Sequence, residues 1–346
     1  MVENEKDLLV SIKDLRTYFY LAEGVVRAVD GVDLDIHRRE TMGIVGESGC
    51  GKSIMSLSLL NLVPQPGKII SGDILYYRAG KNPASPNISD VINITKLDPN
   101  GREIREIRGN QISMVFQEPM TAMIPVRTIG EQITEVITLH QKVGKAEARE
   151  KAIEMLARVR MPKPERVIDD YPFQLSGGMR QRAVIAMGLS CRPNLLIADE
   201  PTTALDVTTE AQILNLMRDL QQEFGMAIMY ITHNLGVIAE MADNVAVMYL
   251  GKVVEQTDVN SIFFNPLHPY TTGLLASIPQ LSDAVAHIDK RRLNVIKGMV
   301  PDPYSRIKGC PFHPRCPQMI SGVCDQEEPK VIQKGPNHLV RCHLYN

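Results

Sequence analysis

An octapeptide in the first sixth of the chain has the residue types and spacing of a phosphate-binding loop. The run Gly46-Glu47-Ser48-Gly49-Cys50-Gly51-Lys52-Ser53 fits the pattern G-x-x-x-x-G-K-[ST]. Its glycines permit a tight loop whose N–H groups surround a β-phosphate, Lys52 can reach the β- and γ-phosphate oxygens, and the Ser53 hydroxyl can bind Mg²⁺. We predict a nucleotide site here, against the alternative of a glycine turn that merely closes a strand–helix unit.

A second run supplies the carboxylates that hydrolysis of a bound nucleotide needs. Leu195-Leu196-Ile197-Ala198 is an apolar strand pattern that ends in Asp199-Glu200. Asp199 can reach the water shell of Mg²⁺, and Glu200 can orient or polarise an attacking water. The alternative is a helix N-cap and its neighbour, which the nearby phosphate loop makes the weaker interpretation.

A third run could bind an anion at the start of a helix. Leu175-Ser176-Gly177-Gly178-Met179-Arg180-Gln181-Arg182 places glycines where a helix begins, and an open helix N-terminus favours negative charge.

Four short apolar runs must position this chemistry. They are Met42 to Val45, Ile112 to Phe116, Leu195 to Ala198 and Ala227 to Thr232, and each ends in a polar residue or motif. Runs of this kind indicate strands buried on both faces of a parallel sheet, where ligands bind beyond the carboxyl ends. Ile54 to Leu62 and the spacing of Ile213, Leu216, Met217 and Leu220 predict helices, with Gly225 as a C-cap. The first forty residues alternate like antiparallel strands.

Taken together and in this order, the motifs resemble those of ABC-type ATPases over about residues 8 to 260, with LSGGMRQR matching the signature motif. The resemblance implies an α/β P-loop NTPase core: a RecA-like parallel sheet, an N-terminal antiparallel β subdomain and a helical signature subdomain at about residues 118–190. It also implies that Phe19 stacks on adenine, although Tyr18 and Tyr20 flank it and all three could pack on a core.

The same resemblance implies the remaining roles. Gln117 matches the Q-loop glutamine and would bind Mg²⁺ together with Ser53 and Asp199. Ala204-Leu205-Asp206 matches the D-loop, and His233 matches the switch histidine. Catalysis would rest on Glu200, His233, Lys52 and Gln117. Two ATPase subunits of this family enclose two ATP molecules head to tail, so Ser176, Gly177, Gly178 and Asp206 would serve the ATP held by the other subunit.

The composition of the chain limits its possible partners and location. The chain has 346 residues, 44% hydrophobic and 23% charged, and a formal net charge of -2, which gives no electrostatic case for nucleic acid as a partner. We expect a cytosolic chain that does not cross a membrane, because no apolar run approaches a span of roughly 20 residues. Proline becomes dense after Ser261, so we divide the chain into residues 1–260 and an extension at 261–346 that does not continue the sheet.

The extension holds four of the six cysteines. Its runs Asn265 to Leu275 and CPFHPRCP resemble elements of peptide and nickel importer ATPases. That resemblance implies a [4Fe-4S] cluster bound by Cys310, Cys316, Cys324 and Cys342. Zinc held by some cysteines with His313 or His343 is the rival, and unliganded thiols are a third possibility. We expect Cys50 and Cys191 to be packing residues.

We therefore expect an ATP-hydrolysing importer subunit for dipeptides or oligopeptides at the cytoplasmic face of the membrane. Its partners would be a second ABC ATPase, two transmembrane permease subunits that contact residues 118–126, and indirectly an extracytoplasmic solute-binding protein. The alternatives are a nickel importer ATPase and a soluble ABC regulator with a redox- or iron-sensing cluster. The sequence also predicts a long surface loop over residues 76–100, whose role it leaves open.

Overall fold

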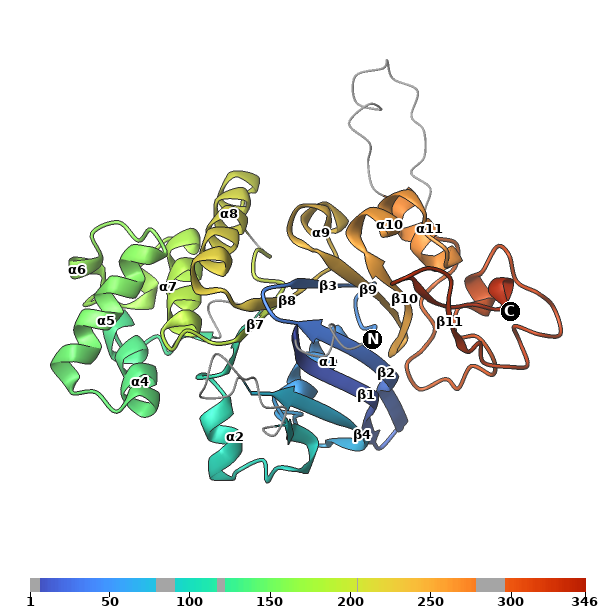
Figure 1. The fold of residues 1–346 in the computed structure, drawn as a ribbon, viewed down its shortest axis with the longest axis horizontal. Helices are drawn as coiled ribbons and strands as arrows, with labels where there is room; N and C mark the ends of the chain where they lie inside the picture. Colours follow the sequence, from blue (N-terminus) through green and yellow to red (C-terminus); the bar gives the residue numbers. More distant parts are fainter. Residues whose placement is uncertain (1–6, 79–90, 117–121, 204, 278–295) are drawn as a thin grey trace, which may run out of the picture.

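The computed structural model describes residues 7–78, 91–116, 122–203, 205–277 and 296–346. Figure 1 shows a central sheet with helices above it, an antiparallel sheet below it, a helical region at one end and the C-terminal region at the other. No helix in these described ranges is long and apolar enough to cross a membrane.

The main sheet has the strand order β11-β12-β10-β9-β3-β8-β7-β6, and its central strands are parallel. The four strands predicted from the apolar runs are all present. They are β3 (Thr41–Val45), β6 (Ile112–Val115), β7 (Leu195–Asp199) and β8 (Ala227–Thr232). Every residue of β3, β7 and β8 is buried, as expected of strands covered on both faces.

The register of these strands brings their carboxyl ends to one edge. Val45 pairs with Thr232 of β8, and Asp199 pairs with Ile231 of the same strand. The phosphate loop, the Asp-Glu pair and His233 therefore leave neighbouring strands at nearly the same level, which confirms the predicted convergence.

The second sheet, of order β2-β1-β4-β5, is antiparallel, as the alternation of the first forty residues predicts. Its strands are β1 (Leu8–Leu21), β2 (Gly24–His37), β4 (Gly67–Tyr77) and β5 (Val91–Asn93). The prediction of a surface loop over residues 76–100 was wrong at its ends, because β5 and the turn η2 (Ile94–Lys96) return to this sheet and Ile94 is fully buried. Residues 79–90 lie outside the described residues.

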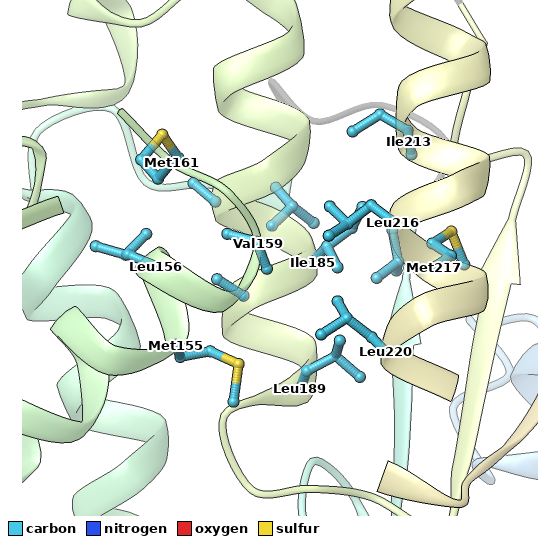
Figure 2. Close-up of a cluster of buried hydrophobic side chains, with 14 of the residues drawn as sticks. Met155, Leu156, Val159, Met161, Ile185, Leu189, Ile213, Leu216, Met217 and Leu220 are labelled. Atoms are coloured by element: carbon cyan, nitrogen blue, oxygen red, sulfur yellow. The ribbon is translucent and has the colours of Figure 1, made fainter. Parts of the chain in front are cut away.

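Helices cover the sheet and form a separate lobe. They are α1 (Lys52–Leu59), α2 (Arg102–Ile107), α4 (Ile129–Gln141), α5 (Lys145–Arg158), α6 (Pro164–Val167), η3 (Pro172–Gln174), α7 (Gly177–Leu189), α8 (Val207–Phe224) and α9 (Leu235–Met241). Figure 2 shows side chains of α5, α7 and α8 meeting in one apolar cluster. Helix α8 ends at Gly225, whose φ of 64° makes it the predicted left-handed C-cap.

The C-terminal region begins after β9 (Asn244–Tyr249) and β10 (Lys252–Asp258). It contains α10 (Val259–Phe264), α11 (Pro269–Ala276), η4 (His313–Arg315), β11 (Val331–Gln333), β12 (Leu339–Arg341) and η5 (His343–Tyr345). The expectation that it does not continue the sheet was wrong: β12 pairs with β10, placing Val340 opposite Glu255. Strands of three residues are too short to show the alternation by which a strand is recognised.

The C-terminal region also shares a core with the sheet. The rings of Tyr249, Tyr270 and Phe312 lie 4.7 to 5.4 Å apart and are almost fully buried. Aromatic rings at such separations add attraction beyond their buried area. The extension is therefore joined to the main sheet by ordinary apolar packing.

Candidate ATP site

Backbone crowding requires glycine at two positions of the phosphate loop. A Cβ at Gly46 would lie 2.2 Å from the carbonyl oxygen of Met248. Gly51 has a φ of 104°, and a Cβ there would lie 2.0 Å from the carbonyl oxygen of Ala28. Any larger residue would move the loop, so these glycines fix the path of the backbone between β3 and α1.

Lys52 is the first residue of α1 and is buried against the loop it serves. Its Nζ donates to the carbonyl oxygens of Gly46 at 2.7 Å and Glu47 at 3.1 Å. Helix α1 has no side-chain N-cap, so its first N–H groups are open to an anion. Cys50 packs in the core, and burial raises the pKa of its thiol, in agreement with the predicted packing role.

Asp199 has the properties of a cation ligand. Its carboxylate is buried, and its Oδ1 has no hydrogen-bond partner within the described residues. Burial raises the pKa of Asp199, a hydrogen bond with Ser53 opposes the shift, and the charge of Glu200 adds to it. A buried carboxylate oxygen without a partner costs free energy. The hydroxyl of Ser53 beside it completes an oxygen donor pair that suits Mg²⁺.

Glu200 and His233 meet at the edge of the sheet. Oε1 of Glu200 lies 3.0 Å from Nδ1 of His233, and Oε2 accepts a hydrogen bond from Thr203 at 3.2 Å. The side chain of His233 is 64% exposed and that of Glu200 14%. Glu200 has a φ of 46°, a backbone conformation that residues other than glycine rarely adopt. Such strained conformations are concentrated at functional sites.

A cleft of about 1650 Å³ brings several of the predicted residues together. Phe19 contributes to its wall, and the remaining predicted residues along it are Ser48, Gly49, Gly51, Lys52, Ser53, Glu200 and His233. The ring of Phe19 also lies against Gly67, since a Cβ at Gly67 would lie 2.6 Å from it.

The signature residues lie elsewhere. Ser176 caps α7 by accepting from the N–H of Met179 at 3.3 Å, and Asp206 caps α8 by accepting from the N–H of Thr209 at 3.0 Å. None of Ser176, Gly177, Gly178 and Asp206 lines the cleft. Gln117, residues 118–121 and Ala204 fall outside the described residues, so their predicted roles stay predictions.

The four cysteines of the extension form a group of free thiols. Burial raises the pKa of Cys310 to about 12, and the charges of Cys324, Cys342 and Cys316 act in the same direction. Across the described part of the chain, no three His, Cys, Asp or Glu side chains lie close enough to hold one metal ion. The arrangement thus leaves the predicted iron–sulfur cluster without support, and the rival zinc site as well. Both ring nitrogens of His343 already bond to protein atoms.

The sequence analysis missed one part of the site. Glu47 of the phosphate loop contacts two residues of the C-terminal region: its N–H donates to the Tyr270 hydroxyl at 2.9 Å, and its carboxylate accepts from Arg315 at 2.7 and 3.0 Å. Both partners belong to the runs that resemble importer elements, but nothing in the sequence of those runs indicates a contact with residue 47. Residues 302, 303 and 305–309 also line the cleft.

Comparison with known proteins agrees with this geometry. Residues 29–203 match the family model described as ABC transporter, and residues 254–324 match the model described as oligopeptide/dipeptide transporter, C-terminal region.

Curated relatives match along nearly the whole chain. The oligopeptide transport ATP-binding protein AppD of Bacillus subtilis is 49% identical over 97% of this chain and 97% of its own. The dipeptide transport ATP-binding protein DppD of the same organism is 44% identical over 97% of this chain and 94% of its own. The probable peptide ABC transporter ATP-binding protein y4tR of Sinorhizobium fredii is 47% identical over 100% of this chain and 98% of its own.

Solved structures agree as well. The ATP-binding cassette MJ0796, in a dimeric post-hydrolysis state bound to ADP and Pi, has a TM-score of 0.60 and 28% identity over 72% of this chain and 99% of its own. The fold and the strand-end site thus define a P-loop ATPase of the ATP-binding cassette type. The chain belongs to the ABC transporter family, among the ATP-binding and ATP-hydrolysing subunits of its oligopeptide and dipeptide group.

Proposed function

We propose that this chain powers the uptake of dipeptides or oligopeptides by hydrolysing Mg-ATP in the cleft between the phosphate loop and Glu200. The observation that carries the proposal is the buried Oδ1 of Asp199, which has no hydrogen-bond partner among the described residues and lies beside Ser53, directly before Glu200 of the Glu200–His233 pair. Mg²⁺ held by Ser53, Asp199 and Gln117 would neutralise charge on the phosphates. The relatives AppD and DppD, by name transporters of oligopeptides and dipeptides, support the cargo.

The residues of the chain have distinct tasks in this proposal. Lys52 leaves the carbonyl oxygens of Gly46 and Glu47 and binds the β- and γ-phosphates, while the N–H groups of the loop and of α1 surround the β-phosphate. Glu200 accepts a hydrogen bond from the attacking water, and His233, which holds Glu200 at 3.0 Å, faces the developing charge. Phe19 stacks on the adenine.

A second ABC ATPase completes the site. The signature residues Ser176, Gly177 and Gly178 and the D-loop residue Asp206 lie off the cleft, which suits service to the ATP of another subunit. The dimeric state named for MJ0796 supports this arrangement. Two permease subunits anchor the pair at the cytoplasmic face of the membrane, with residues 118–126 as the contact.

The test is isolation of the transporter through an affinity tag on this chain, followed by reconstitution in vesicles. We expect two permeases and two ATPase subunits to co-purify, and ATP-dependent accumulation of labelled di- or oligopeptide that Glu200→Gln abolishes. A chain that purifies without membrane proteins, or vesicles that accumulate nickel but no peptide, would refute the proposal.

We propose further that Cys310, Cys316, Cys324 and Cys342 bind a [4Fe-4S] cluster. Four cysteine thiols in one short region form a soft donor set, and the resemblance of their surroundings to importer elements favours a cluster over a single ion. The cluster would add covalent cross-links to the extension. Iron and acid-labile sulfide assayed on anaerobically purified protein test this idea; zinc alone, or free thiols alone, would contradict it.

A further inference from the structure

The tail residue Arg315 makes a buried, two-pronged contact with the phosphate loop. Nη1 of Arg315 donates to Oε2 of Glu47 at 2.7 Å and Nη2 donates to Oε1 at 3.0 Å. The side chain of Arg315 is only 4% exposed and that of Glu47 26% exposed. A bidentate arginine–carboxylate pair fixes orientation as well as distance, so Glu47 cannot turn without breaking both bonds.

Both partners are themselves held in place. The guanidinium of Arg315 lies 5.8 Å from the ring centre of Tyr249 and donates from Nε to the carbonyl oxygen of Lys297 at 3.3 Å. On the loop side, the N–H of Glu47 donates to the Tyr270 hydroxyl at 2.9 Å. The C-terminal region thus holds the backbone and the side chain of Glu47 at once.

Glu47 passes this constraint to the phosphate-binding groups. Its carbonyl oxygen accepts from Nζ of Lys52 at 3.1 Å, and the N–H groups that would face the phosphates follow it directly in the chain. The carboxylate is not used in the phosphate-loop pattern, which requires no particular residue at this position. The pair Arg315–Glu47 therefore connects the extension to the ATP site without touching the nucleotide.

We propose that Arg315 is a positioning residue for ATP binding: through Glu47 it holds the phosphate loop in the shape that accepts the triphosphate, and the C-terminal region thereby sets the affinity for ATP. This inference rests on the assignment of residues 46–53 as the ATP site. Without Arg315, Glu47 and the loop would relax to other positions, and binding would include the cost of restoring them.

The experiment measures the dissociation constant of Mg-ATP for the full-length chain in a Glu200→Gln background, where turnover is suppressed. We expect Arg315→Met to weaken binding roughly ten- to a hundredfold, by analogy with the loss that follows removal of a residue that orients a metal ligand. Arg315→Lys should give a smaller loss, because it keeps the charge but not the two parallel bonds. The double variant Arg315→Met/Glu47→Gln should bind no more weakly than Arg315→Met, because the two changes remove one interaction.

The matched control is His338→Gln. His338 belongs to the same C-terminal region, and its Nε2 lies 2.7 Å from Oε1 of the buried Glu255, with no contact to Glu47. We expect this variant to lower the denaturation midpoint and to leave the ATP affinity unchanged. The proposal is overturned if folded Arg315→Lys and Arg315→Met both bind ATP within about twofold of the parent, or if His338→Gln weakens binding as much as Arg315→Met. If Lys52→Ala binds ATP normally, the site assignment itself fails instead.

Discussion

The strand-end edge and the C-terminal region represent opposite ways of building a functional surface. At the edge, neighbouring strands β3, β7 and β8 deliver their chemistry side by side because parallel pairing aligns their carboxyl ends. In the C-terminal region, short elements separated by irregular chain are held by three aromatic rings and by buried polar contacts such as Arg315–Glu47 and His338–Glu255. The first surface depends on a regular backbone and the second on individual side chains, so single substitutions should affect them differently.

The largest expected effect falls on the strand-end edge. Glu200→Gln should lower the rate of ATP hydrolysis by roughly 10²–10⁴-fold, because the amide cannot accept the proton of the attacking water. ATP binding and the denaturation midpoint should change little, since the amide still accepts a bond from Thr203. Phosphate release and nucleotide binding measured on one preparation check the prediction. The control is Glu240→Gln, a surface residue paired with Arg218; a variant Glu200→Gln that hydrolyses ATP at the parent rate would contradict the role.

The next effect compares the two cores. Phe312→Ala should cost about 3–5 kcal/mol of unfolding free energy, because it removes a fully buried ring from contact with Tyr249 and Tyr270. Leu216→Ala, in the cluster of Figure 2, should cost about 2–5 kcal/mol. Urea unfolding gives both values. A loss below about 1 kcal/mol for Phe312→Ala would mean that the extension is an appendage that the core does not need.

A smaller effect concerns backbone fit in the extension. Gly309 has a φ of 77°, and a Cβ there would lie 2.3 Å from the carbonyl oxygen of Cys324. Gly309→Ala should therefore cost about 1–3 kcal/mol through strain and displacement. Gly322→Ala is the matched control: its φ is 79°, but a Cβ would meet nothing within 4 Å, so only the conformational cost applies. Equal midpoints for the two variants in urea would show that the approach to Cys324 is not tight.

The smallest effect is at the entry to the C-terminal region and depends on pH. Asp258 caps α10 through hydrogen bonds from the N–H and the hydroxyl of Ser261, which lower the pKa of its carboxyl from the usual 3.8. A carboxyl whose pKa is lower in the folded state stabilises the fold at pH values above its unfolded-state pKa. This stabilisation is lost as the pH falls through the folded-state pKa.

Asp258→Ala should accordingly cost about 1 kcal/mol at pH 7, and the difference from the parent should shrink as the buffer is taken from pH 7 toward pH 3. Urea midpoints across this range check the trend. If the difference between Asp258→Ala and the parent grew on acidification, the ionised carboxylate of Asp258 would not be the form that stabilises the cap.

The sequence was sufficient for the strand-end edge and insufficient for the C-terminal region, for a physical reason. Apolar runs such as Leu195 to Ala198 are long enough to show burial on both faces, and a loop with fixed glycines follows β3 in a recognisable pattern. Arg315 and Glu47 lie 268 residues apart, and each belongs to a motif that is recognised by its other residues. No periodicity of the sequence indicates a contact over such a separation. The clustering of the cysteines indicated metal ligands, but the positions of these cysteines in space depend on the same irregular chain and could not be predicted.

The pairing of β12 with β10 has a consequence for synthesis on the ribosome. Glu255 is synthesised well before its partner Val340, which lies 85 residues further along the chain. During that interval the hydrogen-bonding edge of β10 is open, and an uncovered edge is a template for pairing with another nascent chain. A chain truncated between these positions would keep the strands β3, β7 and β8 of the nucleotide site but leave the edge of β10 uncovered, and we expect it to aggregate more readily than the full chain.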